Sequence, residues 1–427
     1  MRQATLGSVL FVNQHYYPDV ASTGQHLTDL AEHLVRQGWA VDVVTGQGRY
    51  VAGRMPAPSL EVRNGVTIRR CRTASFGRTR HVGRILDYAS FYFQVFVRLL
   101  FGRRRSGVVF LTTPPLLSVV GAVVRLLRGQ QYGVWSMDLH PAAEIASGML
   151  RAGGVVARVL GAINAFGLRF ADFVVDLGPY MKGRITAMGV PVERCHTVHV
   201  WSDATEIVPI PRDENPLVRQ LGLSDKFVVM YSGNAGLVHD FRDILEAMRQ
   251  LKDDPHIHFL FVGDGPRRRE IEAFVRTHAI RNFEYRSYFA RDELRWSLSL
   301  ADAHLVSLRE PFVGISVPGK LYGIMASGRP PIFVGPARCE SAEAISGGDC
   351  GVVIDPSAGD AAARIVETLG SWSRDPGLAR DLGARGRVTF ESHFERQRNC
   401  DDFARVLHRA WVPPADEASE LLPEIAH

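Results

Sequence analysis

The stretch FVVMYSGNAG (227–236) decides the fold, because in it an apolar, strand-like run passes directly into a glycine-bearing loop. Apolar side chains then recur at helical spacing, at Phe241, Ile244, Leu245, Met248 and Leu251. A second apolar run, 258–262, leads into the turn GDGP (263–266), whose proline is well placed to open a helix. Strand, loop, helix and strand in this order are typical of the start of a parallel, doubly wound sheet.

The N-terminal half repeats this order. Residues 8–13 predict a strand and 14–23 a loop, and a helix follows with one apolar face, made by Leu27, Leu30, Ala31 and Leu34. Gly38 ends this helix, and residues 39–45 predict the next strand. Two separate starts of this kind predict an α/β protein with two Rossmann-like domains that face each other across a cleft. The proline-rich stretch 200–216 is the expected connection between them.

Composition places the chain among soluble globular enzymes. Its 427 residues suit two domains, and 46% hydrophobic with 22% charged residues is ordinary for such proteins. The five cysteines are scattered, and none lies in a CxxC pair or near a histidine at metal-ligand spacing, so neither a disulfide framework nor a zinc site is indicated. The N-terminus lacks the layout of a signal peptide, so we expect a cytoplasmic protein.

The net charge of +5 is unevenly distributed, because eleven arginines lie between residues 61 and 109 against only Glu61 and Asp87. They flank the apolar segment 85–101, which polar residues interrupt too often for a membrane span. The segment 108–127 is split at Pro114-Pro115 into a strand and a helix capped by Thr113. Segment 85–101 with Arg84 and Arg103–Arg105 then has two interpretations, a helix on an anionic membrane surface or a buried helix of the first domain. We expect no nucleic-acid partner, since stacking aromatics are not interleaved with the basic residues.

In a sheet of this class, ligands bind at the carboxyl ends of the strands, where backbone amides favour anions. The loop SGNAG (232–236) has this position but lacks the GxGxxG spacing of a dinucleotide fingerprint. The loop 13–24 has the equivalent position in the first domain. Taken alone, glycines in such loops are weak evidence, because tight turns need glycine anyway.

Longer motifs resemble retaining glycosyltransferase family four, in particular its colanic-acid and O-antigen subgroup. The motifs are NQHYYPD (13–19), STG (22–24), LAEHL (30–34), YSGNAG (231–236), FVGDGP (261–266) and VPGKLYGIMASGRP (317–330). The resemblance runs from about Ser8 to about Phe403, and the last motif is the most specific. It implies a GT-B fold with an acceptor domain over 1–204, a donor domain over 205–395 and a helix over 396–412 that crosses back to the first domain. We expect a mobile tail over 413–427.

The resemblance also implies the reaction. A sugar moves with retention of configuration from a nucleotide-sugar, with UDP favoured over GDP, to a lipid-linked diphosphate or saccharide acceptor in bacterial surface polysaccharide synthesis. The nucleotide-sugar is a co-substrate, and neither a further cofactor nor a catalytic metal is implied. In agreement, Asp253-Asp254 lies in a turn before Pro255 and does not form a DxD at a strand end. We expect an enzyme at the inner face of the plasma membrane.

The motifs assign roles by position. Lys320 is the cation for the departing diphosphate, Glu310 matches the first acid of the family's paired-glutamate motif, and Asp138 and His140 in WSMDLHP (135–141) would orient or deprotonate the acceptor. Glycine amides would approach the diphosphate, and the base would be read near 263–265 and 286–288. The expected donor-binding residues are Gly24, Gly233, Asn234, Gly236, His239, Gly263, Asp264, Gly265, Ser287, Tyr288, Ser316, Val317 and Leu321.

Three positions depart from the family pattern. Asn234 and His239 stand where many relatives carry an arginine and a lysine that grip the diphosphate, and Gly323 stands at the position expected for the second glutamate. Two alternatives therefore stay open, a nucleotide-sugar epimerase with the same fold and a non-catalytic relative that binds a nucleotide or glycan.

Overall fold

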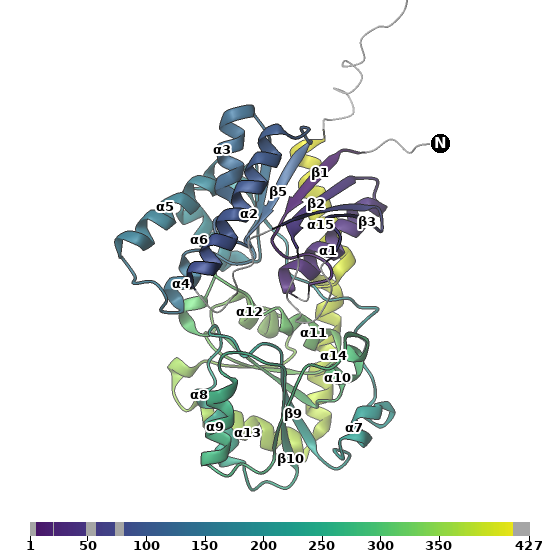
Figure 1. The fold of residues 1–427 in the computed structure, drawn as a ribbon. Helices are drawn as coiled ribbons and strands as arrows, with labels where there is room; N and C mark the ends of the chain where they lie inside the picture. Colours follow the sequence, from purple (N-terminus) through teal and green to yellow (C-terminus); the bar gives the residue numbers. More distant parts are fainter. Residues whose placement is uncertain (1–5, 20, 48–56, 73–80, 413–427) are drawn as a thin grey trace, which may run out of the picture.

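The computed structural model describes residues 6–19, 21–47, 57–72 and 81–412. It contains two parallel-sheet domains that follow one another along the chain, and Figure 1 shows them as an upper lobe in purple and blue and a lower lobe in green. The arginines at 78 and 80, the side chains of Arg84 and Ile85 and the tail 413–427 lie outside the described residues.

The N-terminal sheet has eight strands in the order β3-β4-β2-β1-β5-β6-β7-β8, and only β3 pairs antiparallel. Its central strands are almost wholly buried, which is typical of a sheet covered on both faces by helices. The strands are β1 (Ser8–Val12), β2 (Ala40–Gly46), β3 (Leu60–Arg63), β4 (Val66–Cys71), β5 (Gly107–Leu111), β6 (Tyr132–Trp135), β7 (Val174–Asp176) and β8 (Cys195–Thr197). The helices are α1 (Ser22–Arg36), α2 (His81–Phe101), α3 (Ser118–Arg128), α4 (Ala142–Ala146), α5 (Val155–Arg169) and α6 (Pro179–Ala187).

The C-terminal sheet has six parallel strands in the order β11-β10-β9-β12-β13-β14. The strands are β9 (Phe227–Ser232), β10 (Ile257–Val262), β11 (Phe283–Arg286), β12 (Ala303–Ser307), β13 (Pro331–Val334) and β14 (Val352–Ile354). The helices are α7 (Pro216–Gln220), α8 (Arg242–Gln250), α9 (Arg268–Thr277), α10 (Leu294–Ser299), α11 (Lys320–Ala326), α12 (Glu340–Gly347), α13 (Ala361–Arg374) and α14 (Pro376–His393). The strand order reverses between β9 and β12, so the loop after β9 lies at the position where such sheets bind ligands.

Two expected helix starts differ from the structure. Thr113 does not cap a helix, because Leu116 has φ of +65°, outside the helical region, and α3 begins only at Ser118. Pro266 does not open α9, since the Arg268 amide bonds to the Gly265 carbonyl in a turn and the helix begins at Arg268. Both differences are short shifts at the ends of elements whose type was predicted correctly.

The last helix, α15 (Arg396–Trp411), packs on the N-terminal domain. His33 of α1 contacts Asp401, with 2.7 Å between Nε2 and Oδ1, and the Trp411 indole donates to Asp172 at 3.1 Å. Figure 1 shows this helix, in yellow, rising from the lower lobe into the upper one. The chain therefore crosses between the domains twice.

The two crossings lie side by side. Ser202 and Glu395 form a parallel bridge, in which the Ser202 amide donates to the Phe394 carbonyl at 3.2 Å and the Arg396 amide to the Ser202 carbonyl at 3.0 Å. Arg387 of α14 holds the connection to the lower lobe, because its guanidinium donates to the carbonyls of Ala326 and Ile207. The connection after Ser202 is thus fastened to the C-terminal domain.

The segment 85–101 is part of α2, which is apolar on two faces. Phe91, Val95 and Leu99 are buried against the domain, whereas Phe93 and Phe101 are exposed. The interpretation as a buried helix therefore holds for one face of α2, whereas other positions carry exposed aromatic side chains. Among the described residues, no helix combines the length and apolarity that crossing a membrane requires.

Two buried histidines make the stability of the C-terminal domain sensitive to acid. Burial lowers the pKa of His304 to about 4 and that of His239 to about 3, against about 6.5 in an unfolded chain. Between these values the unfolded state binds protons that the native state does not, so the free energy of unfolding falls as the pH falls from 6.5.

His304→Gln tests this dependence, because glutamine keeps a donor for the Leu298 carbonyl that His304 Nε2 contacts at 2.9 Å. The free energy of unfolding of the variant should depend less steeply on pH than that of the native chain. The difference in slope should be up to about 1.4 kcal/mol per pH unit between pH 6.5 and 4. Denaturant titrations at several pH values measure the difference. Parallel curves for the two chains would contradict the prediction.

Candidate active site

The loop that follows β9 contains Gly233, whose backbone conformation would be strained for any other residue. Gly233 has φ of +126°, and its amide donates to the Val262 carbonyl at 2.8 Å. A Cβ at this position would lie 3.2 Å from Lys320 Cε and 3.3 Å from its Nζ. The backbone at Gly233 therefore lies directly against the lysine that the sequence assigned to the diphosphate.

The loop that follows β10 interlocks with it. A Cβ on Gly263, whose φ is +139°, would lie 2.2 Å from the Gly233 carbonyl oxygen, and one on Gly265 would lie 2.6 Å from the Ala235 amide nitrogen. The Ala235 amide donates to the Asp264 carbonyl at 2.7 Å. The two loops form one backbone surface at the carboxyl end of the sheet, where groups of this kind favour anions.

Lys320 is held over an aromatic ring. Its Nζ lies 3.7 Å from the centre of the Tyr231 ring and donates to the Tyr231 hydroxyl. Desolvation lowers the pKa of Lys320 well below its usual value, since burial penalises the charged form. A bound anion reverses this penalty, so the site favours a negatively charged ligand beside Gly233.

His239 is neutral and cannot supply a charge to the diphosphate. Its side chain is buried, and its Nδ1 donates to the Ser307 carbonyl at 2.6 Å. Burial, with a further effect of the nearby Lys320 charge, lowers the pKa of His239 to about 3. At neutral pH the environment of His239 therefore favours the neutral imidazole, which would not bring a positive charge to a diphosphate.

Two arginines that sequence analysis missed support the same loop. Arg267 Nη1 donates to the His239 carbonyl at 2.5 Å, and Arg309 Nη1 donates to the Leu237 carbonyl at 3.0 Å. Arg309 also donates its backbone amide to Val238 at 3.0 Å. The position of Arg267 directly after GDGP was the available signal. These cations surround the loop that would receive the diphosphate.

The expected base-binding residues lie open on the surface. Asp264, Ser287 and Tyr288 are all exposed, and so is Asn234, which was expected near the diphosphate. Asp264 Oδ1 accepts from the Gly265 amide at 2.9 Å, which is the contact of a tight turn. The Tyr288 ring approaches Gly263, since a Cβ there would lie 3.3 Å from Tyr288 Cε1.

Besides Lys320, the segment from the end of β12 into α11 holds four predicted residues, and one of them points into the protein. Glu310 is exposed, and Ser316 and Val317 are partly buried. Leu321 is completely buried in the core, so its side chain does not face a ligand. Gly323 likewise faces the interior, since a Cβ there would meet Leu298, Ser202 and Ile207. A ribose-binding acid does not fit at that position.

Asp138 makes contact between the domains. It forms an antiparallel bridge with Ser316, and the neighbouring Leu139 amide donates to the Ile315 carbonyl at 3.0 Å. Burial raises the pKa of Asp138, against the opposing effects of His140 and of a hydrogen bond from Ser316. Ser316 precedes Lys320 by four residues. Its contact with Asp138 therefore brings the WSMDLHP motif (135–141) to the segment that leads into Lys320.

His140 forms a pair with a carboxylate that sequence analysis did not single out. Its Nδ1 lies 2.7 Å from Glu144 Oε1, and the spacing of four residues was the available signal. Desolvation lowers the pKa of His140, but the hydrogen bond and charge of Glu144 outweigh it, so the pKa is raised overall. Since Nδ1 faces Glu144, Nε2 is the nitrogen left to meet a substrate.

Gly24 lies in α1, where a Cβ would come within 3.1 Å of the His15 carbonyl carbon. Its described contacts are with its own domain. The predicted donor-binding residues of the C-terminal domain lie in the loops after its strands and at the start of α11. Within the described ranges, no group of three or more His, Cys, Asp or Glu side chains is arranged so that it could hold a metal ion.

Comparison with known families matches each domain separately. The Glycosyl transferase 4-like domain matches residues 23–201, and the Glycosyl transferases group 1 family matches residues 226–371. These ranges coincide with the two sheets. The chain is a GT4-type glycosyltransferase.

Two curated relatives match most of this glycosyltransferase. It is 26% identical over 343 residues to the colanic acid biosynthesis glycosyl transferase WcaI of Escherichia coli K12, covering 78% of this chain and 84% of that one. It is 27% identical over 325 residues to the glycosyltransferase WbjE of Pseudomonas aeruginosa, covering 74% of this chain and 79% of that one. The resemblance to the surface-polysaccharide subgroup is confirmed.

Solved structures confirm the GT-B fold. Sucrose-phosphate synthase from Thermosynechococcus elongatus superposes with a TM-score of 0.75 at 17% identity, covering 94% of this chain and 98% of that one. Anabaena HepE in complex with UDP-glucose superposes with a TM-score of 0.70 at 15% identity, covering 94% of this chain and all of that one.

Gly263→Ala tests the interlocked loops. The new Cβ would meet the Gly233 carbonyl at 2.2 Å in a left-handed conformation, so we expect a loss of about 2 kcal/mol or more in the free energy of unfolding. Gly236→Ala in the neighbouring loop is the control, since its Cβ would come no closer than 3.2 Å to Asn234 Nδ2. Equal stability of the two variants in denaturant titrations would argue against close packing of these loops.

Proposed function

We propose that this glycosyltransferase moves a hexosyl or N-acetylhexosaminyl group from a UDP-sugar to a lipid-linked or saccharide acceptor in surface polysaccharide synthesis, with retention and without a metal. The observation that carries the proposal is the Lys320 ammonium beside the backbone of two interlocked glycine loops. Such an arrangement places one cation, against a backbone surface with no side chains in the way, where a departing nucleoside diphosphate gains negative charge.

The name of one relative and the ligand bound in one structural neighbour support the proposed classes of acceptor and donor. One curated relative is named for colanic acid biosynthesis, and a structural neighbour was solved with UDP-glucose. Neither identity exceeds 26%, so the sugar and the linkage are assigned here only as classes.

The chemistry follows from the placement of the cation. The bond between the anomeric carbon and the diphosphate oxygen breaks, and its electron pair stays with the diphosphate. The acceptor oxygen bonds to the same carbon and loses its proton. Lys320 is placed for this step by geometry, because its Nζ lies against the Gly233 backbone, where the negative charge of the diphosphate would grow.

His140 is the better candidate for the proton acceptor. The Asp138 carboxyl is occupied at the domain interface with Ser316, whereas His140 is oriented through Nδ1 by Glu144. A carboxylate that holds one imidazole nitrogen leaves the other positioned to take a proton. Glu310 is exposed beside the loop 237–238 and would contact the hydroxyls of the donor sugar.

Lys320→Ala tests the proposed donor site. It should weaken UDP binding, measured by calorimetry, by about tenfold to a hundredfold, since a charge-assisted contact is lost. Lys252→Ala, which removes a lysine just after α8, is the control and should bind as the native chain does. Native binding of UDP by Lys320→Ala would contradict the proposal.

The alternative functions give different results in the same preparations. Rapid epimer formation from a UDP-sugar without acceptor would indicate an epimerase. A chain that no UDP- or GDP-nucleotide stabilises against heat would be a non-catalytic relative. Transfer of radiolabelled sugar to a lipid extract, absent in Lys320→Ala, is the outcome expected of the transferase.

The proposal of a lipid-linked acceptor is supported by a surface where the C-terminal ends of α2 and α3 lie close together. Arg128 Nη1 donates to the Leu99 and Leu100 carbonyls, and Arg104 donates to the Arg128 carbonyl. Around this point lie exposed apolar and basic side chains, which we call the α2–α3 patch: Arg98, Phe101, Arg103, Arg104, Leu126 and Leu127. Exposed apolar groups among arginines suit the headgroup region of an anionic membrane at the cytoplasmic face.

Phe101→Ser combined with Leu127→Ser tests the α2–α3 patch. Both side chains are more than half exposed, so the variant should fold normally but lose most of its flotation with vesicles that contain phosphatidylglycerol. Val388→Ser in α14, 63% exposed, is the control. If the native chain shows no preference for anionic over neutral vesicles, the membrane proposal fails.

A further inference from the structure

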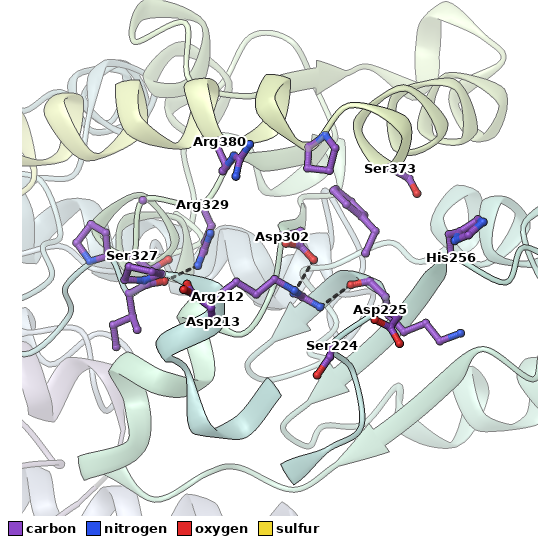
Figure 2. Close-up of a pocket in the computed structure, with 17 residues that line it drawn as sticks. Arg212, Asp213, Ser224, Asp225, His256, Asp302, Ser327, Arg329, Ser373 and Arg380 are labelled. Carbon is purple, nitrogen blue, oxygen red and sulfur yellow. Dashed lines mark hydrogen bonds and ion pairs between the residues drawn. The ribbon is translucent and has the colours of Figure 1, made fainter. Parts of the chain in front are cut away.

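A second cavity opens on the opposite end of the C-terminal sheet from Lys320. Its volume is about 690 Å³, within the range of small-molecule sites. Phe227, Asp302 and Arg329 line it, and these residues start or immediately precede β9, β12 and β13. It therefore lies at the amino ends of the strands, whereas the glycine loops lie at the carboxyl ends. Figure 2 shows the cavity.

One partly buried carboxylate, Asp302, lies near three guanidinium groups there. Figure 2 shows Arg212 bonded to Asp302, with Arg329 and Arg380 to one side of it. Arg212 Nη1 donates to Asp302 Oδ2 at 2.8 Å, and the Val228 amide donates to the same oxygen at 2.7 Å. Burial raises the pKa of Asp302 while all three arginines act against it. One carboxylate balances one of three positive charges, so two remain.

Arg212 and Arg329 are held rigidly by backbone carbonyls. Arg212 also donates to the carbonyls of Leu223 and Lys226. Arg329 Nη2 donates to the Ile210 carbonyl at 2.7 Å and to the Ser299 carbonyl at 2.8 Å. Arg329 Nε is buried and has no hydrogen-bond partner in the described chain. A buried, unsatisfied donor of a charged group is costly, which indicates that a ligand or water completes the site.

Arg380 supplies the uncommitted charge. It projects from the first turns of α14 and is exposed. Within the part of the chain that the structure describes, it makes no hydrogen bond or ion pair, although its charge acts on both Asp302 and Arg329. An exposed arginine without a partner beside one held by backbone carbonyls, at the same cavity, is an arrangement that suits an oxyanion.

The rim carries opposite charges that largely cancel. Asp213 and Asp225 line the cavity but are exposed, so solvent screens them. Lys226 Nζ donates to the Pro255 carbonyl at 2.6 Å, and His256 is exposed beside it. The excess positive charge is thus carried by Arg329, which is partly buried, and by Arg380, which is exposed beside it.

We propose that this cavity binds the phosphate group of a small molecule of about sugar-phosphate size, with Arg380 and Arg329 as its ligands. It is distinct from the proposed donor site and does not depend on it. Apolar walls from Pro209, Ile210 and Pro376 leave room for the remainder of the ligand. α11 joins the two sites, because it begins at Lys320 and ends just before Ser327 and Gly328, which line the cavity.

Calorimetry with inorganic phosphate and with glucose 1-phosphate tests the proposal at constant ionic strength. The Lys320→Ala chain serves as background, so that the donor site does not contribute. Adding Arg380→Glu should weaken binding by about tenfold or more, since a charge-assisted contact becomes a repulsion. Arg374→Glu, an exposed arginine at the end of α13 and outside the cavity lining, makes the same change in net charge and should leave binding unchanged.

Equal binding by the Arg380→Glu and Arg374→Glu chains would overturn the proposal, and so would an absence of millimolar binding in the Lys320→Ala background. Vesicles that contain phosphatidic acid form a separate arm. Binding to them that needs Arg380, without binding of glucose 1-phosphate, would identify a lipid headgroup as the source of the phosphate. Because Lys320 is absent throughout, these results are independent of the donor-site test.

Discussion

The close approach of two backbone segments is the constraint on which the candidate active site depends. Gly263 lies so near the Gly233 carbonyl that a Cβ would stand 2.2 Å from the oxygen. The loops after β9 and β10 consequently share one surface, and Lys320 lies against it over Tyr231. His239, Arg267 and Arg309 then stabilise the remainder of the loop from behind. The absence of a side chain at Gly233 and at Gly263 thus sets the shape of the anion site.

The sequence predicted the two sheets because each begins with an unambiguous strand, loop and helix. It also placed Lys320, Gly233 and Gly263 in one region, and the structure brings these residues into contact. It failed where long-range packing decides. Leu321 is adjacent to Lys320 yet fully buried, and burial makes His239 neutral, which no local pattern reveals.

Contacts between the domains could not be predicted from the sequence for the same reason. Asp138 and Ser316 belong to different sheets, and their pairing needs both domains in place. The arginine-rich stretch shows a related difficulty, because formal charge is not surface charge. Arg70 is buried against Glu61, Arg63 pairs with Glu32, and Arg105 pairs with Asp42. Among the described residues, the basic surface that remains is smaller than the composition indicates, and part of it is the α2–α3 patch.

The paired crossings at Ser202 and Glu395 restrict how the lobes move. Because two strands of chain are bonded to each other at one point, sliding of one lobe along the other would break the bridge, whereas rotation about it would not. Opening to admit a donor and closing over it are therefore expected as a swing about this doubled pivot. The two chain crossings and the hydrogen bonds between them thereby give the enzyme one preferred axis of motion, with Asp138 and Ser316 as the contact that a swing would separate.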